Sequence, residues 1–122
     1  MSKIKEKQCV LVVDDHPKVL RFIEINLKLH GYEVITTTSG QEALDLAKSV
    51  NPDILLLDII MPGIDGFGVL KELRTYSNLP VIAFSASHES QDKAMQLGAN
   101  DFIQKPFDAD KIVSRMKKLL SC

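Results

Sequence analysis

The fold is decided by the stretch CVLVVDDHP, which runs from Cys9 to Pro17. Its first five residues are all apolar, and such a run is typical of a parallel strand that is buried on both faces of a sheet. Two acids end the run, and Pro17 then suits the first turn of a helix. A buried strand that leads within a few residues into a helix predicts a β-α-β unit, in which the strands run parallel.

The rest of the chain repeats this alternation of short apolar runs and longer amphipathic segments. Gly31 ends the first predicted helix, and Ser39 with Glu42 predicts a capping box at the start of the second. Right-handed crossovers place helices on both faces of the sheet. We therefore predict an α/β fold with a doubly wound, five-stranded parallel sheet of order 2-1-3-4-5, the flavodoxin-like arrangement. The later strands are predicted over 32–37, 53–57, 79–84 and 100–103, and the later helices over 67–74, 87–97 and 108–120.

Length and charge narrow the class of protein. The 122 residues are enough for one domain, which we assign to residues 8–122 behind a flexible segment at 1–7. Lysine and arginine (15) nearly balance aspartate and glutamate (16), which argues against nucleic acid or an anionic membrane as a direct partner. The sequence has no secretion signal or membrane-length apolar run, and Cys9 and Cys122 are too few for a disulfide framework. We therefore predict a cytoplasmic protein.

Polar residues at the predicted strand ends are the candidates for function. In doubly wound sheets, ligands bind at the carboxyl ends of the strands, where the strand order reverses. Each residue there also has an ordinary explanation, since aspartates cap helices and turns, serines bond their own backbone and lysines are solvated. Their convergence on one edge favours a shared site over six independent explanations. The residues are Asp14, Asp15, Asp58, Ser85, Ala86 and Lys105.

The chemistry of these residue types points to phosphoryl transfer. Three crowded carboxylates repel one another unless a cation neutralises them. Mg²⁺ suits this role, because it binds through one or two carboxylates, keeps several waters and accepts phosphate oxygens. Lys105 offers a positive charge and Ser85 a hydroxyl for the same oxygens. A carboxylate nucleophile beside a metal, a lysine and a hydroxyl predicts transfer of a phosphoryl group to an aspartate.

At these positions the sequence resembles the receiver domain of two-component response regulators, of the chemotaxis-regulator type. The resemblance extends from Cys9 to Leu120 and rests on four motifs: VVDD at 12–15, DIIMPGIDG at 58–66, SA at 85–86 and KPF at 105–107. It implies that Asp58 is the phosphoacceptor, which takes a phosphoryl group from a phosphohistidine on a sensor histidine kinase or a histidine phosphotransfer protein. It also implies a signalling domain rather than an enzyme, since the domain catalyses only its own phosphorylation and dephosphorylation.

The resemblance implies roles for the other residues of the site. Asp15 is the more direct metal ligand of the two adjacent acids. The implied Mg²⁺ ligands are Asp14, Asp15, Asp58 and the backbone carbonyl of Ile60, and the implied phosphoryl-binding residues are Ser85, Ala86 and Lys105.

A conformational switch is implied at Ser85 and Phe102. In the family, the hydroxyl at the first position moves toward the phosphate and the aromatic ring turns into the vacated space. This movement repacks the face made by the fourth helix, the fifth strand and the fifth helix. The peptide bond between Lys105 and Pro106 is implied to be cis.

Two positions depart from the common choices in the family. Phe102 lacks the hydroxyl of a tyrosine, so a hydrogen bond that would hold the inward rotamer is missing. Ile60, two residues after the phosphoacceptor, is apolar where many relatives are polar. Our hypothesis is that Ile60 hinders the attack of water on the acyl phosphate, so that the phosphorylated form is long-lived.

Other functions remain open at the level of sequence. A protein-binding pseudo-receiver should lack a site residue, and none is missing here. A small phosphatase with an aspartate nucleophile should carry Asp-x-Asp, whereas Asp14 and Asp15 are adjacent. A flavin binder should have a first loop rich in Ser, Thr and Gly. The output, as a separate effector or a linked domain, is left open, and a phosphorylation-dependent homodimer is a possible response.

Overall fold

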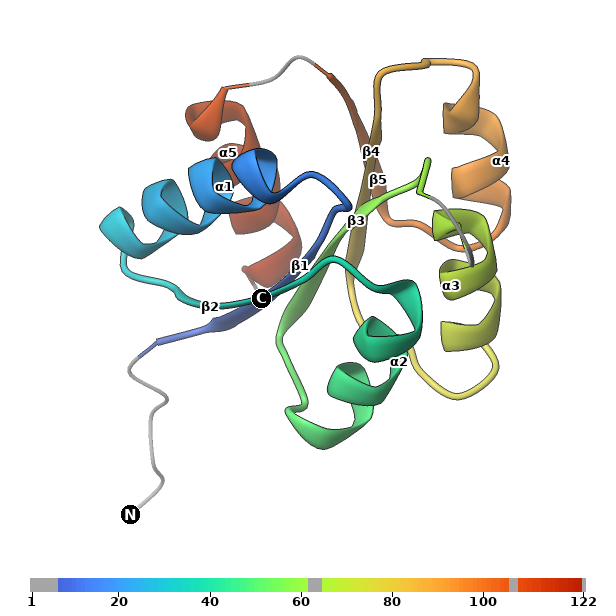
Figure 1. Ribbon diagram of the computed structural model, residues 1–122, viewed down its shortest axis with the longest axis horizontal. Helices are drawn as coiled ribbons and strands as arrows, with labels where there is room; N and C mark the ends of the chain where they lie inside the picture. The colour runs from blue at the N-terminus through green and yellow to red at the C-terminus, as the bar shows by residue number, and fades with distance from the viewer. Residues whose placement is uncertain (1–6, 62–64, 106–107, 122) are drawn as a thin grey trace.

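The chain forms one parallel sheet between two layers of helices. The computed structural model describes residues 7–61, 65–105 and 108–121. Five strands lie in the order β2-β1-β3-β4-β5, so the predicted fold and strand order are confirmed (Figure 1). The strands are β1 (Cys9–Val13), β2 (Glu33–Thr37), β3 (Ile54–Asp58), β4 (Val81–Ser85) and β5 (Asp101–Gln104). The helices are α1 (Pro17–Leu29), α2 (Gly40–Ser49), α3 (Gly66–Leu73), α4 (Ser90–Gln96) and α5 (Ala109–Leu120).

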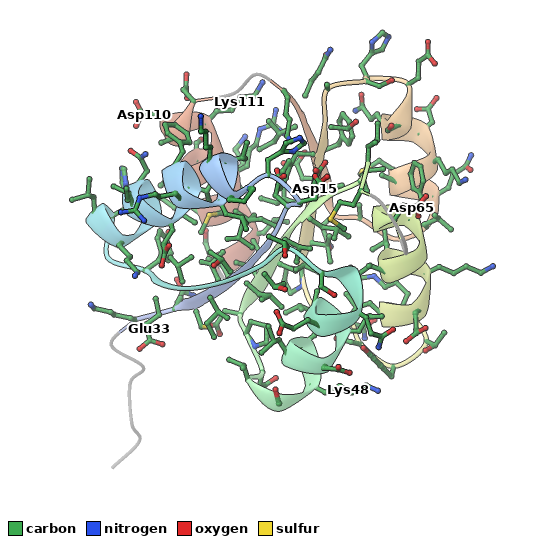
Figure 2. All side chains as sticks on the ribbon, in the orientation of Figure 1. Asp15, Glu33, Lys48, Asp65, Asp110 and Lys111 are labelled. Carbon is green, nitrogen blue, oxygen red and sulfur yellow. The ribbon has the colours of Figure 1, made fainter. Side chains whose placement is uncertain are left out.

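Each face of the sheet buries its own hydrophobic core. Successive side chains of a strand point to opposite faces, so Val10 and Val12 pack beneath α1 and α5, while Leu11 and Val13 pack on the other side. Helices α2, α3 and α4 cover that second side (Figure 1). Charged side chains such as Glu33 and Lys48 lie on the outside (Figure 2). This double burial explains why the central strands are apolar throughout.

Three helices begin at a side-chain cap that the sequence supplies. Ser39 Oγ accepts the Glu42 N–H at 3.1 Å, which is one half of the predicted capping box. The other half is absent among the described residues, because the Glu42 carboxylate accepts a hydrogen bond from the Thr37 hydroxyl instead. Asp65 caps α3 and Asp108 caps α5 in the same way.

Some element boundaries differ from the prediction. Strand β3 continues through Asp58, and β4 continues through Ser85. Helix α4 begins at Ser90 rather than at residue 87, because Ser87 accepts the Ser90 N–H in a turn that precedes the helix. The two longer strands bring both polar side chains onto the rigid sheet. None of the helices in the described part of the chain has the length and hydropathy that a bilayer span needs.

Candidate metal centre

The carboxyl ends of three neighbouring strands carry buried polar side chains. Asp14 directly follows β1, while Asp58 and Ser85 are the last residues of β3 and β4. The register pairs Val13 with Leu57 and Asp58 with Phe84, so these ends lie level at one edge of the sheet. Asp14, Asp58 and Ser85 are 0%, 2% and 1% exposed. Polar groups this deeply buried require partners or a bound cation.

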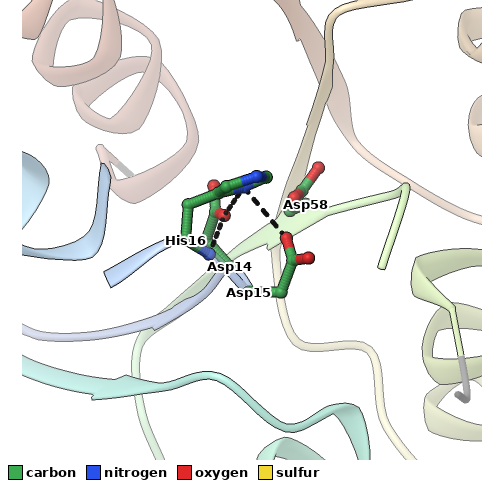
Figure 3. Close-up of side chains that lie close together, drawn as sticks. All are labelled: Asp14, Asp15, His16 and Asp58. Carbon is green, nitrogen blue, oxygen red and sulfur yellow. Dashed lines mark hydrogen bonds and ion pairs between the residues drawn. The ribbon is translucent and has the colours of Figure 1, made fainter. Parts of the chain in front are cut away.

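Four ligand-type side chains meet at this edge. One ligand atom from each of Asp14, Asp15, His16 and Asp58 lies within 4.8 Å of the other three (Figure 3). The predicted cluster of three acids is therefore present in space, and His16 joins it. The sequence analysis gave His16 no role in the site, although its position directly after the two acids was the available signal.

Lys105 supplies the positive charge of the site. Its Nζ lies 3.0 Å from Asp14 Oδ2 and 3.6 Å from Asp58 Oδ2. Two contacts hold Lys105 in position. Its backbone N–H donates to the Ser85 carbonyl at 2.8 Å, and its ammonium lies 5.1 Å from the centre of the Phe84 ring. The ring contact is a cation–π interaction that the sequence analysis did not anticipate.

The site holds more negative charge than Lys105 neutralises. Burial, and then the Asp14 carboxylate, raise the pKa of Asp58 from its usual 3.8 to about 7. The charge of Lys105 and a hydrogen bond from the Ile60 N–H oppose this rise in pKa. Without a further cation, Asp58 therefore holds a proton over part of the neutral range.

The residues of the site fit a hard divalent cation. Asp15 Oδ1 is buried and accepts no hydrogen bond from the described residues. Both oxygens of Asp14 are engaged, one by the His16 N–H at 2.8 Å and the other by Lys105. Asp15 and Asp58 thus have the oxygen atoms best placed to hold Mg²⁺, which prefers such ligands. A buried carboxylate oxygen that accepts no hydrogen bond, beside two other acids, is the arrangement that a metal would complete.

Two of the predicted phosphoryl-binding residues, Ser85 and Ala86, lie at the carboxyl end of β4, the strand next to β3. Ser85 Oγ accepts the Ser87 N–H at 3.1 Å, and Ser85 is 1% exposed. Ala86, the next residue, is exposed, and its carbonyl accepts a hydrogen bond from the Gln104 side chain. Ile60 is 59% exposed at the rim of the site.

The structure describes Phe102 of the predicted switch but not Pro106 of the predicted cis peptide. Phe102 lies opposite Ala83 in the sheet and is buried in the core beneath α4, with 7% of its surface exposed. Pro106 lies outside the described residues, as do residues 1–6 of the predicted flexible segment. The isomer of the Lys105–Pro106 bond therefore stays a prediction.

Comparison with known proteins agrees with this geometry. A family model described as the response regulator receiver domain matches residues 10–117. The receiver domain of the Francisella response regulator 1452 is 35% identical, with a TM-score of 0.87 over 93% of this chain and 96% of that one. The response regulator TrrA from Thermotoga maritima, solved in complex with Mg²⁺ and BeF, is 34% identical, with a TM-score of 0.86 over 93% and 99% of the two chains.

A curated relative is similar over part of its length. The transcriptional regulatory protein KdpE of Mycobacterium tuberculosis is 43% identical over 110 residues, which are 88% of this chain and 49% of KdpE. The chain spans about half the length of the curated relatives that it matches.

Proposed function

The chain belongs to the response regulator receiver domain family of two-component systems, and from this premise we propose that Asp58 accepts a phosphoryl group from a phosphohistidine. The donor is a sensor histidine kinase or a histidine phosphotransfer protein. The observation that carries the proposal is the buried Asp58 carboxylate, which has Lys105 Nζ 3.6 Å away and the Asp15 carboxylate beside it.

The transfer needs an ionised carboxylate. An Asp58 oxygen attacks phosphorus, the bond from phosphorus to the donor imidazole nitrogen breaks, and that nitrogen keeps the electron pair. Lys105 and a cation favour ionisation of Asp58, which has a pKa of about 7 without the cation. Mg²⁺, when bound, supplies positive charge for the phosphoryl oxygens. Asp15 and Asp58 would hold it, with Asp14 and the Ile60 carbonyl completing the proposed ligand set.

The remaining residues bind the transferred group. Lys105 has about a fifth of its side chain exposed, so its ammonium can shift from Asp14 to a phosphoryl oxygen. The Ser85 hydroxyl and the backbone of Ala86 lie at the end of the neighbouring strand and can donate to the other oxygens. The negative charge of the phosphoryl group is thereby shared among groups that the sheet already holds in place.

The switch that we propose transmits phosphorylation to the face formed by α4, β5 and α5. Phe102 is buried on β5 beneath α4, so a shift of Ser85 toward the phosphoryl group alters the space beside its ring. Helix α4 is weakly packed, since Ala94 is the one buried residue among the seven residues of this helix. A weakly packed helix next to the site can change position at low energetic cost. Recognition by an effector, or homodimerisation, would use this face.

Phosphorylation can be tested with a small donor. The protein is incubated with acetyl phosphate, with and without Mg²⁺, and its intact mass is measured. We expect the gain of one phosphoryl group that requires Mg²⁺ and is lost in Asp58→Asn. Asp45→Asn, an exposed aspartate on α2, is the matched control and should be labelled normally. Labelling of Asp58→Asn at the wild-type level would refute the assignment of the phosphoacceptor.

A further inference from the structure

His16 occupies an unexpected position in the acidic site. It precedes α1 at the cap position, yet its side chain makes no cap hydrogen bond with the described residues. The imidazole instead lies over the carboxylates, with Nδ1 3.1 Å from Asp14 Oδ1 and 3.0 Å from Asp15 Oδ1 (Figure 3). One ring nitrogen therefore faces two carboxylate oxygens at nearly equal distance.

A hydrogen bond explains only part of this geometry. A neutral imidazole carries at most one proton on Nδ1, so it cannot donate fully to both oxygens. Asp14 Oδ1 already accepts the His16 backbone N–H at 2.8 Å, whereas Asp15 Oδ1 is buried and accepts no hydrogen bond from the described residues. The imidazole is 65% exposed, so its Nε2–H can be solvated while the Nδ1 lone pair points inward.

The two distances from His16 Nδ1 match an edge of a metal coordination shell. Around an octahedral ion with bonds of about 2.1 Å, two adjacent ligand atoms lie about 3.0 Å apart. The separations of 3.1 and 3.0 Å between Nδ1 and the two oxygens have this value, and Asp58 contributes a further oxygen within 4.8 Å of the other ligand atoms. The nitrogen and the oxygens thus border one volume that a single ion can occupy.

We propose that His16 Nδ1 is a nitrogen ligand of the divalent cation held by Asp15 and Asp58. The inference rests on the proposed function, because it concerns the same metal centre. Imidazole suits later first-row ions such as Ni²⁺ better than it suits Mg²⁺, which prefers oxygen ligands. His16 therefore raises the affinity of the site for transition ions relative to Mg²⁺, a selectivity that carboxylates alone do not provide.

The ligand can be detected directly with Mn²⁺ as a probe. Pulsed electron paramagnetic resonance of the Mn²⁺-bound protein should show the hyperfine coupling of a directly bound imidazole nitrogen. The coupling should disappear in His16→Gln and persist in His88→Gln, which changes another exposed histidine. Displacement of Mn²⁺ by Mg²⁺ identifies the bound ion as the one in this site.

Competition measures the effect on selectivity. The measured quantity is the Ni²⁺ concentration that displaces half of the bound Mn²⁺, corrected for the Mn²⁺ affinity of each protein. In His16→Gln this concentration should rise about tenfold. The corresponding Mg²⁺ value should change less than twofold. Equal changes for Ni²⁺ and Mg²⁺ would overturn the proposal.

The spectrum also separates this proposal from the proposed function. Mn²⁺ that is displaced by Mg²⁺ but shows no nitrogen coupling would disprove ligation by His16 and leave the phosphoryl-transfer site intact. Failure to bind any displaceable Mn²⁺ would disprove both the ligation and the metal dependence of phosphorylation. Because the coupling is measured on the unmodified protein, a variant that fails to fold does not prevent a decision.

Discussion

The Lys105 ammonium donates to Asp14 Oδ2 at 3.0 Å across a sequence separation of 91 residues. Asp14 is fully buried, and Lys105 is 19% exposed. The contact joins the end of β1 to the segment after β5, and it leaves Asp58 with the longer separation of 3.6 Å from the same nitrogen. Lys105 therefore neutralises Asp14 in the resting site and remains within reach of Asp58.

Loss of Lys105 should destabilise the metal-free protein. Lys105→Met leaves the buried Asp14 carboxylate without its cation, and removal of one partner from a buried pair costs about 3 kcal/mol. Urea unfolding at pH 8 in a chelator measures the loss of free energy of unfolding. Saturating Mg²⁺ should restore part of it, because the ion neutralises the same carboxylates.

The matched control is Lys111→Met, at the exposed first turn of α5 (Figure 2). It should change the free energy of unfolding by less than about 0.5 kcal/mol. Equal losses in the two variants would show that the contact with Asp14 contributes nothing specific.

Asp58 should make the stability of the metal-free protein depend on pH. The pKa of its carboxyl is raised from 3.8 to about 7 on folding, chiefly by burial. Between these values the unfolded chain loses the proton that the folded protein keeps, so this carboxyl lowers stability as the pH rises from about 4 to about 7. Asp58→Asn removes the effect and should be more stable than the wild type by about 4 kcal/mol at pH 8, with little difference near pH 4.

Thermal or urea unfolding of both proteins at pH 4 and pH 8, in the presence of a chelator, measures how the stability difference changes with pH. Carboxyl groups far from the site are common to both proteins and cancel in the comparison. A constant difference between the two proteins at both pH values would be inconsistent with a raised pKa of Asp58.

Gly66 should not tolerate a side chain. A Cβ at this position would lie 2.4 Å from Ile59 Cα and 2.5 Å from the Asp58 carbonyl oxygen, both of which are backbone atoms next to the site. Gly66→Ala should therefore cost more than about 2 kcal/mol of stability and reduce phosphorylation of Asp58. Gly31→Asn is the control, because Gly31 has open space and a positive φ that Asn tolerates.

Arg74 should stabilise the connection between α3 and β5. Its Nε and Nη2 donate to the Gly98 carbonyl at 3.0 and 2.8 Å, and Nη2 also donates to Asn100 Oδ1 at 3.1 Å. Arg74→Met leaves these acceptors without their charged donor and should cost about 2 kcal/mol in urea unfolding. Amide exchange around Gly98 should accelerate. Arg21→Met, at an exposed position of α1, should change neither quantity.

Ile60 should prolong the lifetime of the phosphorylated protein. Its side chain is 59% exposed beside Asp58, so a polar replacement can orient water without disturbing the core. Ile60→Asn should accelerate loss of the phosphoryl group several-fold, which corresponds to about 1 kcal/mol in the activation barrier. Decay of the labelled species, followed by intact mass, measures the rate. Leu29→Gln, an exposed apolar position at the C-terminal end of α1, should leave the lifetime unchanged.

The architecture and the edge of the sheet that carries the site could be predicted from the sequence. Buried parallel strands need continuous apolar runs, such as Cys9–Val13, and helices between them need a period near 3.6 residues, so the two patterns are distinguishable along the chain. Parallel strands also share the edge at which their carboxyl ends lie. Asp14, Asp58 and Ser85 could therefore be assigned to one site before any coordinates existed.

The division of roles among these groups depends on the three-dimensional packing. Asp14 and Asp15 are adjacent in sequence, but Asp14 is buried against Lys105. Asp15 Oδ1 accepts no hydrogen bond from the described residues and lies beside Asp58. The contact of His16 with both acids was likewise hidden, because it depends on how the chain turns between β1 and α1. Short-range patterns specify which face a residue occupies, whereas distances between charges arise from packing of segments up to 91 residues apart.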